Sequence, residues 1–482
     1  MNILLVYPSR LDSCGRLVKY RQAFLPPLAL AILTALTPPP HAVRVVNDLV
    51  EEIDFAADVD LVGISIMTSQ AERGYRIADR FRKRGVKVVI GGIHASCRPE
   101  EARRHASAVV IGEAETTWPK VLVDAETGRL QPYYQADGWA DLSRSPGPDF
   151  SKFRLDVYAS TPFSRFPIMM PVFTTRGCPY GCRFCSVTRF FGSRYRTKPV
   201  AQVVAEILSI GAPEYFFVDD NLTCQPEYAR ELFAALEGLK REGKGIRFFS
   251  QVSTRILLHT DLIDRAARAG CSGLFIGIES IEERNLSAMG KTFNRVVDYE
   301  ELFSRLQGAG ISPHPSIIFG FDSDTPAQFG RTFDFLVRTR VGGASFWLLT
   351  PLPGTDLFEE MERDGRLLEG QRWSSYDMDH VVFRPRNFTP DDLYQRFWAH
   401  CRRFHSWKNT LRRIGFKVAM SRNPLKTAVN QAILGYRFRL AILAGDNPFS
   451  CGFGRYLADG EGGQSKSAGL LTETPGRFRT WV

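Results

Sequence analysis

The segment Thr174-Thr175-Arg176-Gly177-Cys178-Pro179-Tyr180-Gly181-Cys182-Arg183-Phe184-Cys185 decides both the fold and the chemistry that this sequence predicts. Its cysteines have the spacing C-x3-C-x2-C. Three thiolates can hold three irons of a 4Fe–4S cluster and leave the fourth iron open to a small molecule. The alternatives are a zinc knuckle or three unrelated thiols, but zinc needs a fourth ligand and no His or Cys follows until Cys224. We therefore predict a cluster on Cys178, Cys182 and Cys185.

This segment strongly resembles the cluster motif of the radical S-adenosylmethionine superfamily, including the aromatic residue, Phe184, before the third cysteine. The resemblance implies that the open iron binds S-adenosylmethionine. It also implies a one-electron donor, such as flavodoxin or ferredoxin, whose electron cleaves S-adenosylmethionine to a 5′-deoxyadenosyl radical. Such a cluster needs a reducing compartment, so we expect the other six of the nine cysteines to be mostly free thiols.

Strand and helix patterns alternate after the cysteine segment. The expected strands, counted from the one that delivers the cysteines, are 172–175, 215–218, 247–254, 273–278, 315–319 and 344–349. Six such units predict an open (β/α) partial TIM barrel whose chemistry lies at the carboxyl ends of its strands.

Polar residues follow several of these strand ends. The resemblance implies that S-adenosylmethionine contacts come from Phe184, Asp219, Asp220, Arg255, Glu279 and Ser280. Asp219 and Asp220 could instead cap the next helix, which aspartate often does. A surface salt bridge is the alternative for Arg255, because arginine is usually exposed.

The first 125 residues also alternate between strand and helix, which predicts a doubly wound, Rossmann-like parallel sheet with a ligand crevice at its strand ends. The expected strands are 2–7, 42–48, 61–67, 87–90 and 108–111. Small or polar residues follow three of them. Glycine at such positions lets a large flat ligand approach the backbone.

These strand ends resemble the cobalamin-binding domain of cobalamin-dependent radical S-adenosylmethionine enzymes. The residues that the resemblance assigns to cobalamin binding are Ser65, Met67, Thr68, Gly91, Gly92, His94, Gly112 and Glu113. The motif Asp-x-His-x-x-Gly, which supplies a histidine to cobalt in the methionine-synthase type, is absent. The resemblance then implies a lower axial face without histidine. His94 could contact the corrin or be an ordinary loop histidine, and a degenerate domain that binds nothing is the alternative for the whole segment.

The net charge of +10 is unevenly distributed. Residues 393–445 contain no Asp or Glu and carry many Arg and Lys residues among apolar ones. This predicts an anionic partner, either an anionic substrate or a membrane surface contacted peripherally. The alternative is an ordinary packing helix with a solvated basic face. No nucleic acid is expected.

Composition changes predict five segments. They are a cobalamin-binding domain (1–130), a linker rich in Pro and Gly (131–171), the partial barrel (172–365), a helical, basic region (366–459) and a disordered tail (460–482). The N-terminus reads as a strand rather than a signal peptide. No apolar run approaches the ~18 residues that a membrane span needs. We expect a cytoplasmic protein, peripheral at the inner membrane surface at most.

The function that the resemblance implies is cobalamin-dependent methylation of an unactivated carbon in an apolar or anionic metabolite, such as a lipid or a tetrapyrrole. The runner-up uses the same cofactors for oxidative cyclisation or rearrangement. An alternative of another class is a metal- or cluster-binding module without catalysis.

Overall fold

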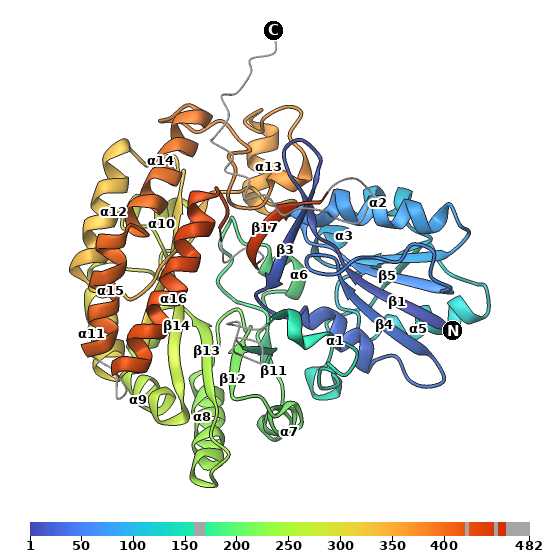
Figure 1. The fold of residues 1–482 in the computed structure, drawn as a ribbon, viewed down its shortest axis with the longest axis horizontal. Coiled ribbons are helices and arrows are strands. Elements are labelled where there is room, and N and C mark those ends of the chain that lie inside the picture. Colours follow the sequence, from blue (N-terminus) through green and yellow to red (C-terminus); the bar gives the residue numbers. More distant parts are fainter. Residues whose placement is uncertain (159–168, 420–423, 448–451, 459–482) are drawn as a thin grey trace.

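The computed structural model describes residues 1–158, 169–419, 424–447 and 452–458. Its parallel strands form two six-stranded sheets, which lie on opposite sides of the molecule (Figure 1). The N-terminal sheet, in blue, has its own helices. The second sheet, in green and yellow, is surrounded by helices of the barrel and of the C-terminal region. The predicted fold class is confirmed.

The N-terminal sheet is parallel throughout. Its strands, in spatial order, are β4 (Ala42–Asn47), β1 (Asn2–Tyr7), β5 (Leu61–Ser65), β6 (Lys87–Gly91), β7 (Ala108–Ile111) and β8 (Tyr133–Gln135). Runs such as Val88-Val89-Ile90 are buried on both sides, as expected for strands with helices on both faces. The spatial order reverses at β1, which makes the β1–β5 junction the switch point where such sheets bind ligands.

Helices cover both faces of this sheet. They are α1 (Leu28–Ala35), α2 (Ala71–Arg82), α3 (Ile93–Cys97), α4 (Pro99–His105) and α5 (Trp118–Glu126). Leu30 of α1 and Trp118 of α5 share one apolar cluster with Ile3 of β1. The cluster on the other face joins Phe81 of α2 and Ala102 of α4. The sheet is therefore doubly wound, as the strand–helix alternation predicts.

The second sheet is the open barrel. Its strands, in spatial order, are β16 (Ser345–Leu348), β15 (Ser312–Phe319), β14 (Cys271–Glu279), β13 (Arg247–Val252), β12 (Glu214–Phe217) and β9 (Met170–Val172), all parallel. The helices along it are α7 (Val200–Ile210), α8 (Pro226–Arg241), α9 (Thr260–Ala269), α10 (Glu283–Ala288), α11 (Tyr299–Gly308), α12 (Pro326–Arg338) and α13 (Asp356–Arg363). Strands β16 and β9 are edges, so the barrel does not close.

A short hairpin carries the cysteine segment. Its strands are β10 (Thr175–Arg176) and β11 (Arg196–Thr197), and helix α6 (Val187–Phe191) lies between them. Because β10 follows β9 almost directly, the hairpin sits beyond the carboxyl end of the first barrel strand. Strand β9 thus delivers the cysteines to the edge where barrels of this type hold their chemistry.

The C-terminal region is mostly helical, with α14 (Pro390–Phe404), α15 (Trp407–Ala419) and α16 (Pro424–Leu443). Phe397 and Phe404 of α14 belong to the same apolar core as the barrel strands. The chain then returns to its beginning. Strand β17 (Gly452–Leu457) pairs antiparallel with β3 (Leu17–Ala23), which also pairs with β2 (Arg10–Leu11). None of the described helices is both long and apolar enough to cross a membrane.

Candidate active site between the two sheets

The three cysteines lie together on the loop between β10 and α6. Cys185 N donates to the Cys182 carbonyl at 3.0 Å, and Cys178 N donates to the Gly192 carbonyl at 3.3 Å. Gly177 has φ +89°, and a side chain there would overlap the Arg194 carbonyl. The sharp turn before Cys178 therefore requires glycine.

Burial dominates the electrostatics of these thiols. It is the main reason that the pKa of Cys182 is raised to about 11 and that of Cys185 to about 12, and the charge of a neighbouring cysteine contributes to each rise. The pKa of Cys178 is raised for the same first reason. Three crowded thiolates need a positive centre among them, and an iron–sulfur cluster supplies one. Among the described residues, no group of three or more His, Cys, Asp or Glu side chains is arranged to hold a single metal ion. The loop fits a cluster.

Lys291 is a buried cation beside this loop that the sequence analysis did not identify. Its ammonium bonds Glu279 Oε1 at 2.6 Å and also lowers the pKa of Cys182, which burial raises. Burial alone would lower the pKa of Lys291, but Glu279 and Cys182 raise it. Lys291 is therefore held as a cation near the cysteines. Because Lys291 follows the cysteines by some 100 residues, no local sequence pattern indicates that it lies beside them.

Glu279 and Ser280 lie at the carboxyl end of β14. Glu279 is buried and has φ +58°, a conformation that non-glycine residues rarely adopt and that is frequent at functional sites. The pairing register between β14 and β15 shifts at this point. The Ser280 hydroxyl accepts from Asn285 Nδ2 at 3.0 Å and from Glu282 N at 3.1 Å. The strand end is thus bent and held in a fixed geometry.

The two aspartates after β12 have different surroundings. Asp219 is buried and accepts hydrogen bonds from Thr174 N (3.0 Å), Thr174 Oγ1 (2.8 Å) and both polar groups of Thr175. Its carboxylate therefore ties β12 to the strand that carries the cysteines. Asp220 lines the cavity between the domains, and burial together with the charge of Asp219 raises its pKa to about 7.

The remaining two residues assigned to S-adenosylmethionine are Phe184, on the loop itself, and Arg255, which lies near it. Phe184 is partly buried and packs against the barrel core. Arg255 is exposed on the 3-10 helix Thr254–Leu258 and has no ion-pair partner in the part of the chain that the structure describes. Burial raises the pKa of Tyr180 on the cysteine loop, and Arg255 partly opposes that rise. The Arg255 guanidinium therefore lies near the cysteine loop.

A cavity of about 270 Å³ separates the two domains and receives residues from both. Ser65, Gly91, Gly92, Gly112 and Glu113 line it from the carboxyl ends of β5, β6 and β7. Barrel-side residues in the same wall are Phe173, Thr175, Arg176, Phe190, Phe191, Val218 and Asp220. The structure thereby brings five of the residues assigned to cobalamin to one place, directly beside the cysteine hairpin.

The glycines of this wall leave room for a flat ligand. A Cβ at Gly112 would meet nothing within 4 Å, and one at Gly91 would reach Val110 only at 3.5 Å. Gly92 has another role, because φ is +96° and a Cβ would lie 2.6 Å from the Ile66 carbonyl oxygen. Gly112 has φ +81° as well, so Gly92 and Gly112 both adopt a backbone conformation that favours glycine, whereas Gly91 leaves space that a side chain would fill. The wall fits a corrin.

The other three assigned residues lie elsewhere. Met67 and Thr68 line a second cavity of about 250 Å³, together with Tyr7, Cys97, Ser186 and Trp347. His94 is buried and lines neither cavity; its ring packs edge-on against Trp373 at 5.1 Å, and Nε2 lies 3.5 Å from Glu101 Oε1. This placement supports the alternative of an ordinary packed histidine.

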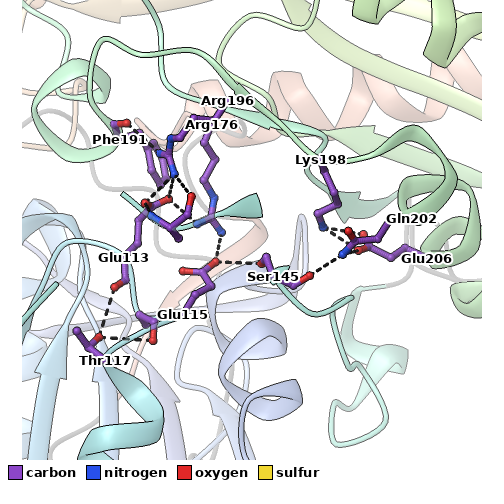
Figure 2. Close-up of polar contacts among 12 residues, drawn as sticks. Glu113, Glu115, Thr117, Ser145, Arg176, Phe191, Arg196, Lys198, Gln202 and Glu206 are labelled. Carbon is purple, nitrogen blue, oxygen red and sulfur yellow. Dashed lines mark hydrogen bonds and ion pairs between the residues drawn. The ribbon is translucent and has the colours of Figure 1, made fainter. Parts of the chain in front are cut away.

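A buried ion network joins the two domains at the cavity wall (Figure 2). Arg176 Nη1 lies 2.7 Å from Glu113 Oε1, and Arg176 Nη2 lies 2.6 Å from Glu115 Oε1. Arg196 Nη1 adds a contact of 2.8 Å with Glu113 Oε2. Burial would raise the pKa of Glu115, but Arg176 holds it below its usual value. Glu113 therefore bridges β7 to the cysteine hairpin, a role that the sequence did not reveal.

Known proteins match both halves of the chain. The family model of the Radical SAM superfamily matches residues 172–336, and that of the B12 binding domain matches residues 28–122. Bacteriochlorophyllide d C-12(1)-methyltransferase of Chlorobaculum tepidum is 33% identical over 344 residues, which are 70% of this chain and 73% of the relative. Hopanoid C-2 methylase of Rhodopseudomonas palustris is 25% identical over 434 residues, 86% of this chain and 79% of the relative.

Two solved structures share the fold. The radical S-adenosylmethionine methyltransferase TsrM from Kitasatospora setae superimposes with a TM-score of 0.61 at 20% identity, covering 75% of this chain and 78% of its own. The cobalamin-dependent enzyme OxsB with aqua-cobalamin bound gives 0.64 at 14% identity, covering 92% and 72%. At these low identities, both superpositions show a shared fold.

A barrel with this cysteine loop, joined across a cavity to a sheet with these glycines, defines a radical S-adenosylmethionine enzyme with a cobalamin-binding domain. The chain belongs to the cobalamin-dependent family of the radical S-adenosylmethionine superfamily. Its cofactors are a 4Fe–4S cluster, S-adenosylmethionine and cobalamin.

Proposed function

We propose that this protein is a C-methyltransferase that acts on an unactivated carbon of an apolar or anionic metabolite. The observation that carries the proposal is the single cavity lined by Gly91 and Gly112 on one side and by Arg176 and Asp220 of the cysteine side on the other. When bound, the cofactors supply a one-electron cleavage of S-adenosylmethionine and a transferable methyl group. The protein contributes positions, charges and the exclusion of water.

Each group of residues has a distinct part in this proposal. Cys178, Cys182 and Cys185 hold the cluster, with the Lys291 ammonium beside them offsetting negative charge. The strained end of β14 at Glu279 and Ser280, together with the Asp220 carboxyl group in the cavity wall, orients S-adenosylmethionine, because a carboxylate pairs well with its ammonium group. Asp219 acts through the threonines of the hairpin as a positioning residue.

The second cavity is the proposed substrate space. Ser186, which follows Cys185 directly, places the cavity beside the cluster loop. Much of the remaining wall is apolar or aromatic, including Met67, Trp347 and Tyr376. The polar Arg10 in this wall is already paired with Asp377 and, at 2.8 Å, with Asp446. Such a wall favours an apolar carbon skeleton over a highly charged one.

The relatives support this substrate class. One acts on a bacteriochlorophyllide and another on a hopanoid, which are a tetrapyrrole and a lipid. A second candidate function comes from the same comparison. Anaerobic magnesium-protoporphyrin IX monomethyl ester cyclase of Rubrivivax gelatinosus is 24% identical over 388 residues, 74% of this chain. Oxidative cyclisation with the same cofactors is therefore the alternative reaction.

Anaerobic turnover with a methyl-labelled S-adenosylmethionine distinguishes the two reactions. The reconstituted protein is incubated with a reduced flavodoxin or ferredoxin and with extracts rich in tetrapyrroles or in lipids. A product that gains one labelled methyl group supports the methyltransferase. A product that loses hydrogen without gaining label supports the cyclase, and unlabelled, unchanged extracts with no 5′-deoxyadenosine contradict both.

A further inference from the structure

Helix α16 exposes a continuous apolar stripe. The exposed residues are Leu425, Val429, Ile433, Tyr436, Leu440 and Leu443, each between 37% and 77% exposed. Their spacing of three or four residues places them on one face of the helix. The opposite face packs inward, with Gly435 against Thr410 and Ile442 in the barrel core. The stripe therefore is not the packing face of the helix.

Helix α15 extends this stripe. Trp407 and Leu411 are 47% and 63% exposed, and the Trp407 ring stacks on Tyr436 of α16 with centroids 6.2 Å apart. The Arg439 guanidinium lies over the Trp407 ring at 5.7 Å. Together these residues of α15 and α16 form one surface, which we call the α15–α16 face. In Figure 1 the two helices lie side by side, in the half of the molecule away from the N-terminal sheet.

The exposed charges that α15 and α16 themselves carry beside this face are positive. Lys408 and Arg412 are exposed on α15, and neither has an ion-pair partner among the described residues. Arg413 and Lys417 instead turn inward, since Arg413 donates to the Phe404 carbonyl and burial lowers the pKa of Lys417 to about 8. No acidic residue occurs in residues 393–445. The face is thus apolar with a basic border and an aromatic pair.

We propose that the α15–α16 face binds the surface of an anionic bilayer, with both helices lying in the plane of the interface. Apolar residues enter the acyl boundary, while Lys408 and Arg412 contact anionic headgroups and Trp407 and Tyr436 sit at headgroup depth. A second copy of the chain is a poorer occupant, because two such faces would bring unpaired positive charges together.

The face also ends close to the proposed substrate space. Asp446, just after the last residue of the stripe, bonds Arg10, which lines the second cavity. A bilayer-bound enzyme would present that cavity near the membrane. Membrane binding itself does not depend on the proposed function and is tested without turnover.

The test is co-sedimentation of the full-length, cofactor-loaded protein with vesicles. The vesicles are pure phosphatidylcholine or a mixture with phosphatidylglycerol, at low and high salt. The proposal predicts binding to the anionic vesicles that falls with salt. The variant Ile433→Asp/Leu440→Asp should lower the partition coefficient roughly tenfold or more, since it removes apolar surface and adds repulsion. Lys408→Glu/Arg412→Glu should weaken binding to anionic vesicles alone.

The matched control is Val123→Asp/Val297→Asp, at side chains that are 57% and 72% exposed outside the face. Circular dichroism and corrin content show that each variant is folded. Absence of binding by the wild type, or equal loss in the control, would overturn the proposal. Light scattering that shows a dimer, converted to a monomer by Ile433→Asp/Leu440→Asp, would assign the face to a second copy and would overturn it too.

Discussion

The two parallel sheets have the same number of strands, but they present different surfaces to the cavity between them. The N-terminal sheet ends in Gly91, Gly92 and Gly112, which contribute space and backbone. The barrel side contributes charge and thiols, through Arg176 and the nearby cysteine loop. Parallel topology thus places a site at the strand ends, and the side chains found there determine its chemistry. We therefore expect that a substitution at the glycine wall and one at the cysteine loop each disable one side of the cavity and leave the other side intact.

Replacing one cysteine should remove the cluster on the barrel side of the cavity and leave cobalamin binding intact. In Cys185→Ala, iron content and 5′-deoxyadenosine formation should fall by more than about 100-fold, because changes to groups that only touch a metal ligand already cost about 10–100-fold. Corrin content should stay unchanged. Cys271→Ala, at a buried thiol that begins β14, is the control and should keep its iron. Full iron content in Cys185→Ala would show that the loop is not the cluster site.

The ion network between the two sides of the cavity can be broken without removing a cysteine and without filling the glycine wall. Arg176→Ala leaves Glu115 buried without its cation, so the free energy of unfolding should fall by about 3–5 kcal/mol. The control Arg338→Ala removes an exposed pair with Glu300 and should cost less than about 1 kcal/mol. Urea denaturation measures both. Equal losses in the two variants would mean that the network does not join the domains.

Acid should destabilise the barrel half through its histidines. Burial lowers the pKa of His314 and of His400 to about 3, so both are neutral in the folded protein. In the unfolded chain they take up protons as pH falls below 6.5, and stability is lost on acidification. For one such histidine, acidification from pH 8 to pH 5 lowers the free energy of unfolding by about 2 kcal/mol. In His400→Phe the new ring would pack beside Phe346, and this variant should lose about 2 kcal/mol less stability than the wild type between pH 8 and pH 5. Parallel stability curves for variant and wild type would contradict this.

Filling the glycine wall should weaken cobalamin binding on the N-terminal side of the cavity and leave the cluster intact. Gly91→Leu adds a side chain to the cavity without backbone strain, because the nearest neighbour of its Cβ is 3.5 Å away. Overpacking of about 1–3 kcal/mol corresponds to roughly tenfold weaker cobalamin binding. Iron content should not change. Gly330→Leu on α12 has open space around it and serves as the control in a cobalamin titration. Unchanged affinity in Gly91→Leu would place the corrin elsewhere.

The sequence predicts the parts of this molecule that are coded locally. The cysteine loop, the strand runs and the glycines at strand ends each lie within a few consecutive residues. Partners far apart in the chain leave no such pattern. The pairing of β3 with β17, the contact of Glu113 with Arg176 and the place of Lys291 beside the cysteines are set by packing. For the same reason the hydrogen bonds of Asp219 to Thr174 and Thr175 were not foreseen, and its contact with S-adenosylmethionine stays a prediction.

The most direct test of a single shared cavity is pulsed electron paramagnetic resonance on the fully reconstituted protein. The cluster is reduced and the corrin is poised as Co(II), so that both centres are paramagnetic. We expect a dipolar coupling between the two signals in the wild type, which disappears when Cys185→Ala removes the cluster. Two full-strength signals with no coupling would show that the cofactors bind apart, and would contradict the shared cavity.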